Sequence, residues 1–478
     1  MKRSKIIGIS FLCFFLIFCI IEKLAQAADY TVTNRDFLDA KKSFDDPRPL
    51  YQGISYKKII PPEVYAKLTY DIEEMKRSWA EAVGFKAPDI VNKIAPEIQP
   101  GTYTYKDKEK YPGLKQLMIP VQYDMFNPGK PPLVGNFPEI KVIPPRQYYW
   151  ATPIAEATKK NMGHTKLNDQ GYIISTSYEA GYPFPMPSGK FKAQQIVYNW
   201  DKTYLLGENA YVTLDMKGIT KNFRIDQNSV VDWWNLRLQG RVLLEPYGFF
   251  DKRAKEQSEK SLALLRFTAP RDMYGFAFSY VYKQDYKDDT LSLIYINALR
   301  RIRKMSATDT QDNAGGQDVI YDDNYGFSQK LSPTRYPYEY ELIDEREYLV
   351  PAYTTDGIAW ISSKGMEYRD IEFERRPLYV VQLTQKDKNY IYSRRILYID
   401  KETFALLACV NYDQKGRLYR TTMLLDQVIP DMGLIAQYHF FCRDYLDQHS
   451  TLSRNLFLPA VWVGRDHCDL SQLLKAPK

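Results

Sequence analysis

The sequence predicts an α+β protein in which an antiparallel β-sheet dominates and a few helices cover it. Aromatic residues make up 14% of the 478 residues, with 39 Tyr and 23 Phe against 4 His and 5 Cys, and aromatic side chains are enriched in strands. Alternating segments separated by short polar turns recur in the second half, which is typical of antiparallel hairpins. A clear helical period occurs nearer the N-terminus, so both kinds of element are expected.

The first 27 residues have the pattern of a cleaved secretory signal peptide. Lys2, Arg3 and Lys5 precede an apolar run at residues 6–21, and Ala-Gln-Ala at 25–27 provides small residues for cleavage. An uncleaved membrane anchor is the alternative, but the run is short against the roughly 20 residues that a spanning helix needs. We therefore expect an exported, periplasmic protein.

Charge and cysteine content narrow the classes of function. Removing residues 1–27 lowers the formal net charge from +7 to +4, which provides no strong field for nucleic acid, so we expect no nucleic-acid partner. Cys409, Cys442 and Cys468 remain. One disulfide with a free thiol and three buried thiols are both compatible with this number.

The N-terminal region predicts a helix followed by an irregular segment. Apolar residues recur at helical spacing over residues 64–82, after Pro61-Pro62 and before Gly84, which predicts one amphipathic helix with a core-facing stripe. Residues 96–145 contain repeated Pro and Gly with neither period, so we expect an irregular wrapping segment. A short helix is expected at 152–160, with Thr152 as its cap and Pro153 in its first turn.

The clearest strand spans residues 274–282, where every second residue is aromatic. Its one face carries Tyr274, Phe276, Phe278, Tyr280 and Tyr282. Such a ladder is either sheet core or the lining of a ligand cavity, and core is the commoner situation.

A hairpin and a meander complete the predicted sheet. After a turn at 286–289, residues 291–304 return as one strand, which places Arg301 and Arg303 on the face of Leu293, Tyr295 and Leu299. Residues 392–400, 404–412 and 417–427 then form an antiparallel meander. Apolar residues lie on both of its faces, so both faces need cover, one by helices and the other by a cavity.

Three ordered stretches resemble a known family. They are GYPFPMP at 181–187 with VYNW at 197–200; RRIRK at 300–304, YDD at 321–323, YEYEL at 338–342 and REYLVPAY at 346–353; and RRPLYVV at 375–381, YSRRILYID at 392–400 and YDQKG at 412–416. Together they are similar to an exported bacterial family known mainly as a domain of unknown function, often labelled outer-membrane lipoprotein-sorting proteins. The resemblance covers about residues 144–427, and Glu341 and Ile343 depart from the family pattern.

The resemblance implies the fold of the lipoprotein carriers LolA and LolB. That fold is a strongly curved antiparallel sheet forming a half-open barrel, with helices at its mouth. With this resemblance, the predicted domain organisation is a signal peptide at 1–27, a helical and Pro-rich wrapping region at 28–143 and a LolA/LolB-like β domain at 144–478. Because family members commonly sit beside RND-type transporters and an outer-membrane protein, it also implies such partners and a hydrophobic cargo.

The sequence shows none of the common catalytic signatures. It contains no Gly-x-Ser-x-Gly elbow, His-Glu-x-x-His, Cys-x-x-Cys or phosphate-binding Gly-rich loop. His439, Cys442 and His449 near residues 466–468 have donor types that suit zinc, but their spacing matches no standard site. The sequence gives equally little support for a Cys nucleophile activated by a neighbouring His. We therefore expect neither an enzyme nor a cofactor.

Clustered arginines have two possible roles. Arg300, Arg301, Arg303 and Lys304 could bind an anionic head group at the rim of an apolar sheet. Ion pairing with Asp322, Asp323 or Glu345 is the alternative that the sequence favours. The same choice applies to Arg375, Arg376, Arg394 and Arg395, which either bind ligand or brace the sheet.

The sequence therefore predicts a periplasmic carrier or chaperone for a lipid or other hydrophobic molecule. The predicted ligand-binding residues are Tyr274, Phe276, Phe278, Tyr280, Tyr282, Tyr295, Arg301 and Arg303. Two alternatives remain: an exported hydrolase acting on lipid or glycan through a scattered site, and a structural envelope protein that docks a partner.

Overall fold

A computed structural model describes residues 56–471, apart from short stretches at 307–308, 329–330, 334–335, 352, 354–359 and 363–365. The predicted signal peptide lies outside the described residues. Within them, the main feature is a 15-stranded sheet with the order β1-β2-β14-β15-β16-β17-β18-β19-β3-β4-β7-β8-β9-β10, in which β11 also pairs with β14. Every pairing in this sheet is antiparallel except that of β2 with β14. The predicted α+β class with a dominant antiparallel sheet is confirmed.

The strands of the large sheet differ in length, and the longest lie in its middle and along one rim. Their bounds are β1 Gly101–Thr104, β2 Glu139–Val142, β3 Asn209–Ile219, β4 Ile225–Arg237, β7 Glu259–Ala269, β8 Ala277–Lys283, β9 Leu291–Ile296, β10 Arg301–Lys304, β11 Tyr338–Pro351, β14 Glu372–Gln385, β15 Arg394–Asp400, β16 Leu406–Tyr412, β17 Leu418–Ile429, β18 Leu434–Asp444 and β19 His449–Pro459. Two small pairs stand apart, β5 Gln239–Arg241 with β6 Gly248–Phe249 and β12 Trp360–Ser362 with β13 Glu367–Arg369.

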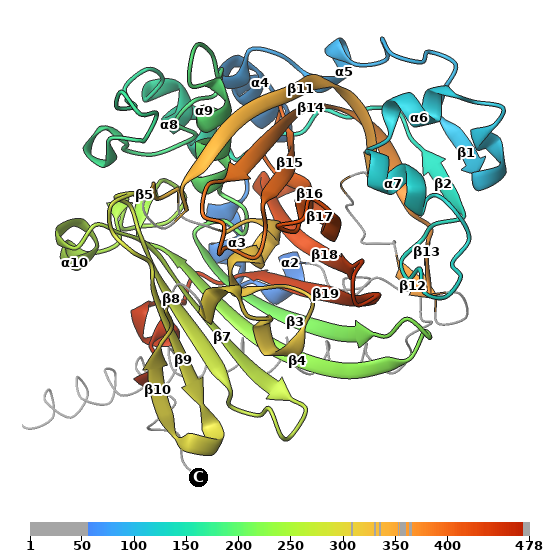
Figure 1. The fold of residues 1–478 in the computed structure, drawn as a ribbon. Helices are drawn as coiled ribbons and strands as arrows, with labels where there is room; N and C mark the ends of the chain where they lie inside the picture. The colour runs from blue at the N-terminus through green and yellow to red at the C-terminus, as the bar shows by residue number, and fades with distance from the viewer. Residues whose placement is uncertain are drawn as a thin grey trace, which may run out of the picture.

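The sheet curves strongly and stays open. In Figure 1 it bends from β11 and β14 at the top, through β18 and β19, to β8, β9 and β10 at the lower left. The strand order ends at β10 on one side and at β1 and β11 on the other, and no pairing joins these ends. The result is the half-open barrel that the sequence led us to expect.

Helices pack at one end of the curved sheet. In Figure 1, α4, α8 and α9 gather beside β11 and β14, and Trp79 of α4 donates its indole N–H to the carbonyl of Glu402 at 2.7 Å. The α-helices are α2 Tyr56–Ile59, α3 Pro62–Leu68, α4 Ile72–Val83, α5 Ala87–Ile90, α6 Gly113–Leu117, α7 Pro120–Met125, α8 Thr152–Lys160, α9 Lys192–Asp201 and α10 Lys252–Glu256. The short 3-10 helices include η3 Asn297–Leu299, η4 Asp309–Gln311, η5 Ala314–Gly316, η6 Tyr321–Gly326 and η7 Pro430–Met432.

The single helix predicted over residues 64–82 is wrong, because the structure divides it into α3 and α4. Thr69 is extended, and the N–H of Tyr70 donates to the carbonyl of Asp431 at 2.9 Å, so it does not continue the helix. Asp71 then caps α4 by accepting from the N–H of Glu74. Gly84 ends α4 in the left-handed conformation, as predicted.

The helix predicted at residues 152–160 forms as α8, with one difference at its start. Ala151 is the N-cap residue, and Thr152 is the first helical residue. The N–H of Ala151 bonds to the carbonyl of Gly433, which holds the entry to the helix without a side-chain cap. Pro153 lies in the first turn, where its missing N–H has no helical partner to lose.

The return strand predicted over residues 291–304 is also wrong, because it is two strands joined by a reversal. Arg300 adopts a left-handed conformation with φ 48° after η3, and β10 folds back antiparallel on β9. Arg301 lies opposite Ile296 and Arg303 opposite Ile294. Directly opposed residues share a face, so both arginines lie on the face opposite to Tyr295, where the sequence had not placed them.

The meander is confirmed as β15, β16 and β17, with bounds shifted by one or two residues. The wrapping region enters the same sheet through β1 and β2, and β2 pairs with β14 at Glu372 and Phe373. The domain boundary proposed at residue 144 stays a prediction. In the described residues no helix has both the length and the apolar character needed to cross a membrane.

Candidate ligand-binding cavity

Two adjoining cavities lie on the concave side of the sheet, beneath residues 309–328, which we call the covering segment. One has a volume of about 70 Å³ and the other about 130 Å³. Both are bounded by strands β4, β7 and β8 on one side and by the covering segment on the other. The covering segment lies between β10 and β11 in the sequence, and it crosses the inside of the curve in Figure 1.

The smaller cavity is apolar and contains part of the predicted aromatic ladder. Phe278 and Tyr280 line it from β8, and Leu265 lines it from β7. Ile320 and Tyr321 of the covering segment close it from above. Phe278 meets Tyr321 edge to face at 5.3 Å between ring centroids, an arrangement that aromatic pairs prefer.

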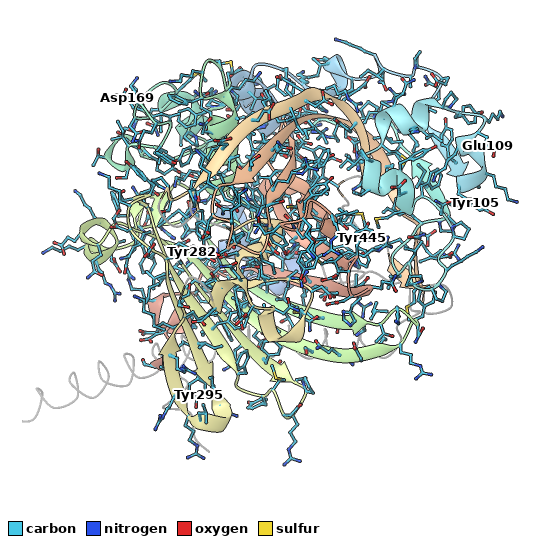
Figure 2. All side chains as sticks on the ribbon, viewed as in Figure 1. Tyr105, Glu109, Asp169, Tyr282, Tyr295 and Tyr445 are labelled. Carbon is cyan, nitrogen blue, oxygen red and sulfur yellow. The ribbon has the colours of Figure 1, made fainter. Side chains whose placement is uncertain are left out.

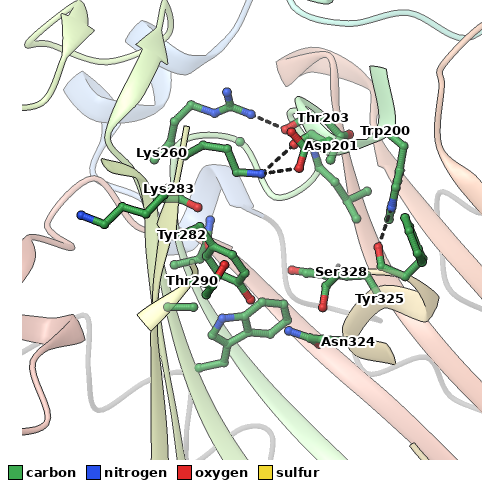
Figure 3. A pocket seen from close by; sticks show the side chains of 18 residues that line it. Trp200, Asp201, Thr203, Lys260, Tyr282, Lys283, Thr290, Asn324, Tyr325 and Ser328 are labelled. Atoms are coloured by element: carbon green, nitrogen blue, oxygen red, sulfur yellow. Dashed lines mark hydrogen bonds and ion pairs between the residues drawn. The ribbon is translucent and has the colours of Figure 1, made fainter. Parts of the chain in front are cut away.

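The larger cavity is more polar, and a lysine–aspartate pair lies at its wall. Lys260 Nζ donates to Asp201 Oδ1 at 2.7 Å, as Figure 3 shows. Burial opposes the ionisation of Asp201, but Lys202 and Lys260 hold its pKa below the usual value. Figure 3 also shows Tyr282 and Thr290 facing Asn324 and Ser328 across the opening.

Trp233 of β4 and Tyr325 of the covering segment line both cavities and separate them. Their ring centroids are 4.8 Å apart. Trp233 Nε1 and the Tyr325 hydroxyl are buried and have no hydrogen-bond partner in the protein. Buried polar atoms are normally hydrogen-bonded, so two such atoms in adjoining positions are a candidate contact for a ligand.

Two polar side chains on the neighbouring strands add to this pair. Asp426 of β17 lies directly opposite Gln437 of β18, and Gln437 lines the apolar cavity. Gln437 Nε2 has no partner, and the carboxyl of Asp426 forms no hydrogen bond with any described residue. Asp426 is 4% exposed, and this burial raises its pKa to about 8. The carboxyl is therefore mostly protonated at neutral pH.

A histidine clamp holds the covering segment to the sheet. His449 at the start of β19 contacts Asp318 through Nδ1 at 2.7 Å and Asp226 through Nε2 at 3.1 Å. Hydrogen bonding to Asp318 is the main reason that the pKa of His449 rises to about 9. Thr451 Oγ1 donates to Asp318 Oδ2 at 2.7 Å and accepts from its N–H at 2.8 Å. The clamp is thus charged at neutral pH.

A second set of polar contacts fixes the other end of the covering segment. Arg395 donates to Asp323 at 2.5 Å, and the Tyr392 hydroxyl donates to the same carboxylate at 2.7 Å. Asp322 accepts from Tyr336 at 2.8 Å and from Tyr390 at 2.9 Å. Charged and polar groups, rather than apolar packing alone, therefore hold this segment over the sheet.

Ion pairs decide the role of three of the clustered arginines. Arg375 pairs with Glu347 at 3.5 Å, Arg376 with Asp400 at 2.7 Å and Arg395 with Asp323. Arg394 lies over the ring of Tyr412, with 4.0 Å from its guanidinium carbon to the ring centroid. The interpretation that these arginines brace the sheet is confirmed for the three that are ion-paired.

The predicted ion pairing of the basic cluster at residues 300–304 with Asp322, Asp323 or Glu345 is wrong. Asp322 binds tyrosines, Asp323 binds Arg395, and Glu345 pairs with Lys192 and Lys401. Arg301 and Arg303 are exposed on the edge strand β10, and neither forms an ion pair with a described residue.

The structure brings together only part of the predicted ligand-binding set. Phe278 and Tyr280 line the apolar cavity, and Tyr282 lines the polar one. Phe276 stacks edge to face on Phe278 at 6.1 Å, whereas Tyr274 is 60% exposed in the turn before β8. The ladder strand therefore begins at Ala277, three residues later than predicted.

Tyr295 lies outside the cavity. It is opposite Ala277 in the β8–β9 pair, on the face away from Phe278, and Figure 2 shows it far along the sheet from Tyr282. Ligand contact by Tyr295, Arg301 and Arg303 stays a prediction that the cavity geometry does not favour.

The candidate zinc ligands do not converge. In the described residues, no group of three or more His, Cys, Asp or Glu side chains is arranged to hold a metal ion. Cys409, Cys442 and Cys468 are three buried free thiols, so that alternative is confirmed over a disulfide among them. Burial raises the pKa of Cys409 and of Cys468 to about 12, which makes both thiols poor nucleophiles.

Comparison with protein-family models identifies the family. Residues 110–455 match DUF1329, described as a protein of unknown function. This chain belongs to the DUF1329 family. The matched region confirms the predicted resemblance and extends beyond residues 144–427 on both sides. A comparison with curated proteins gives no match.

Experimental structures similar to this DUF1329 chain include three bacterial proteins. A domain described as an outer membrane lipoprotein-sorting protein from Vibrio parahaemolyticus is 15% identical, with TM-score 0.39 over 56% of this chain and 91% of that one. A DUF1329 family protein from Desulfovibrio piger is 17% identical, with TM-score 0.40 over 56% and 91%. A LolA superfamily protein from Nitrosomonas europaea is 14% identical, with TM-score 0.34 over 57% and 98%. At these scores the fold rests on the strand order described above.

Sequence reasoning missed the polar groups of this DUF1329 cavity. Trp233 lies in a segment that the sequence identifies as a strand, VVDWWNLR. The two adjacent Trp residues face opposite sides, and the pattern does not show which of them faces the cavity. Asp426 and Gln437 are polar residues that each interrupt an apolar stretch of a strand, and this interruption is the feature of the sequence that could have identified them. The clamp of His449 to Asp318 and Asp226 joins segments far apart in the sequence and leaves no local signal.

Proposed function

We propose that this protein is a periplasmic carrier that encloses a hydrophobic or lipid-like molecule between its curved sheet and the covering segment. The observation that supports this most is the apolar concave face, where Phe278, Tyr280 and Leu265 are covered by a loop rather than by a second sheet or a packed helix. Burial of apolar ligand surface there contributes roughly 25 cal/mol per Å² before ordering costs.

The carrier proposal requires the covering segment to move. Ligand pockets typically measure about 300–1,000 Å³, whereas the two cavities measure about 70 and 130 Å³. Ile320 and Tyr321 occupy space that a ligand would take. The closed arrangement therefore represents the carrier without cargo, and cargo replaces these side chains.

Partners and localisation are finer parts of the same proposal. The family resemblance supports export, work beside an RND-type transporter and exchange with an outer-membrane partner. The protein acts by binding and not by turnover in this proposal, and neither hydrolysis nor partner docking is favoured by a specific feature of the cavity.

The test fills the apolar cavity from its loop side. Val319 lines that cavity, whereas Asp312 of the same segment is exposed. Val319→Trp is expected to weaken binding of a lipophilic fluorophore at least tenfold, because the indole occupies the ligand's space. Asp312→Trp adds the same side chain to the same segment and is expected to bind like the wild type.

Folding of both variants is checked by thermal unfolding, because overpacking costs about 1–3 kcal/mol. A folded Val319→Trp protein with unchanged fluorophore affinity would place binding elsewhere and count against the cavity.

A further inference from the structure

The polar groups that line the cavity floor form a cluster without protein partners. We call Trp233, Tyr325, Asp426 and Gln437 the polar cluster. Trp233, Tyr325 and Gln437 line the apolar cavity, and Asp426 is the cross-strand neighbour of Gln437. Asp426 also interacts electrostatically with Tyr325. The four side chains come from β4, the covering segment, β17 and β18, so the curvature of the sheet brings them together.

Each member of the polar cluster lacks a hydrogen bond that burial normally demands. Trp233, Asp426 and Gln437 are 2%, 4% and 5% exposed. Trp233 Nε1, Gln437 Nε2 and the Tyr325 hydroxyl have no partner, and no described residue bonds to the Asp426 carboxyl. A buried polar group without a hydrogen bond destabilises the folded protein, so these three groups beside the Asp426 carboxyl form a site that is costly unless something binds there.

We propose that the polar cluster binds the uncharged hydroxyl head of an amphipathic ligand whose hydrocarbon part lies in the adjoining apolar cavity. This inference deepens the proposed carrier function and rests on it. The indole N–H and the amide NH₂ donate to the hydroxyl oxygen, and the carboxyl or Tyr325 oxygen accepts from the hydroxyl proton.

The composition of the cluster argues against a charged head. A cationic head would face the indole N–H of Trp233 and the amide NH₂ of Gln437, which donate and cannot accept from it. An anionic head would enter a cavity whose lining residues include no Lys or Arg to compensate its charge. A hydroxyl group both donates and accepts, and so matches three donors and one carboxyl.

Four eight-carbon ligands with different heads test the proposal. Octane, 1-octanol, octanoate and octylammonium are each titrated against a protein-bound lipophilic fluorophore, and the affinity of each is obtained from its displacement. Tyr325→Phe and Trp233→Phe each remove one polar hydrogen while keeping a ring. Each is expected to lower the ratio of 1-octanol to octane affinity by about two- to tenfold, the value of one hydrogen bond.

A matched control lies next to Trp233 in the sequence. Trp234 Nε1 is also buried without a partner, but Trp234 is on the opposite face of β4, where Tyr211 and Arg266 pack on it. Trp234→Phe is expected to leave the 1-octanol to octane ratio unchanged. A ratio that falls equally in Trp234→Phe would overturn the proposal.

Failure of this proposal and failure of the carrier function give different results. If octane and the fluorophore bind but the ratio is the same in all variants, the polar-head site is wrong and the carrier function stands. If octanoate or octylammonium loses more affinity than 1-octanol in Tyr325→Phe and Trp233→Phe, the head is charged and the proposal is wrong. If the wild type binds neither octane nor the fluorophore, the carrier function itself fails.

Discussion

At the scale of single residues, two buried carboxylates of this chain differ in their surroundings. Asp323 accepts from Arg395 and from Tyr392, so its charge is compensated. Asp426 has no hydrogen bond with any described residue, and its burial alone raises its pKa to about 8. A charge taken out of water without compensation is costly, and the group takes up a proton instead.

Asp426→Asn is expected to stabilise the protein increasingly as the pH rises. The folded state holds the Asp426 proton up to about pH 8, whereas an unfolded Asp releases it near pH 4. The wild type therefore loses stability between these pH values, and Asn, which does not titrate, does not. Urea unfolding should show a gain over wild type on the order of 2–4 kcal/mol larger at pH 7.5 than at pH 4.5.

The control for this variant is Asp312→Asn, since Asp312 is exposed on the same covering segment. It should change stability equally little at both pH values. A stability difference for Asp426→Asn that is independent of pH would mean that Asp426 is already ionised in the folded protein.

At the scale of elements, the edge strand β10 explains a basic cluster without invoking a ligand. Arg301, Arg303 and Lys304 are exposed on the last strand of the sheet. Charged side chains on an edge strand discourage pairing with a second sheet. The ends of an open barrel need such protection, and this reading fits the absence of an ion pair at Arg301 and Arg303 among the described residues.

The covering segment is an element held by a titratable clamp. His449 is raised to a pKa of about 9 by hydrogen bonds to Asp318 and Asp226, while a free His titrates near 6.5. Because the folded value is the higher one, the clamp is complete below about pH 6.5 and is lost as the pH rises through about 9.

Fluorophore uptake is expected to become faster between pH 7 and pH 9.5, because loss of the His449 proton frees the covering segment. His449→Ala should take up the fluorophore at least severalfold faster than wild type at pH 7 and should lose most of this pH dependence. Stopped-flow fluorescence measures both rates. An uptake rate that is independent of pH in the wild type would show that the clamp does not limit entry.

Asp447→Asn provides a control for general charge effects near β19. Asp447 is exposed and lies two residues before His449, outside the clamp. It is expected to keep the wild-type rate and the wild-type pH dependence.

At the scale of the whole molecule, the curved sheet and the covering segment have separate roles. Strands β14 to β19 with β3, β4, β7 and β8 form a continuous hydrogen-bonded surface that cannot widen without breaking its ladder. The covering segment bonds to that surface through side chains, at Asp318 and Asp323. The molecule is therefore expected to open by release of the segment and not by deformation of the sheet.

Hydrogen exchange should locate this opening. With the lipophilic fluorophore bound, amides at residues 314–321 are expected to exchange at least severalfold faster than in the free protein, while those of β16, β17 and β18 keep their protection. Mass spectrometry of proteolytic fragments measures both regions in one experiment. Slower exchange at residues 314–321 would show that the segment closes over the ligand without being displaced.

The sequence by itself determined most of the elements, and it determined the family. Alternation marked the meander, and the three ordered stretches indicated the DUF1329 resemblance that the match to residues 110–455 confirmed. Capping chemistry located the end of α4 at Gly84. These features depend on neighbours within a few residues, and so the sequence carries them directly.

Only the tertiary structure decided which side chains meet in the cavity. Strand side chains alternate with period two, so a reversal such as the one at Arg300 moves every later residue to the other face. Arg395 and Asp323 are 72 residues apart, and His449 and Asp318 are 131 apart. Such contacts follow from how the sheet curves and where the covering segment lies across it, and no local spacing encodes either.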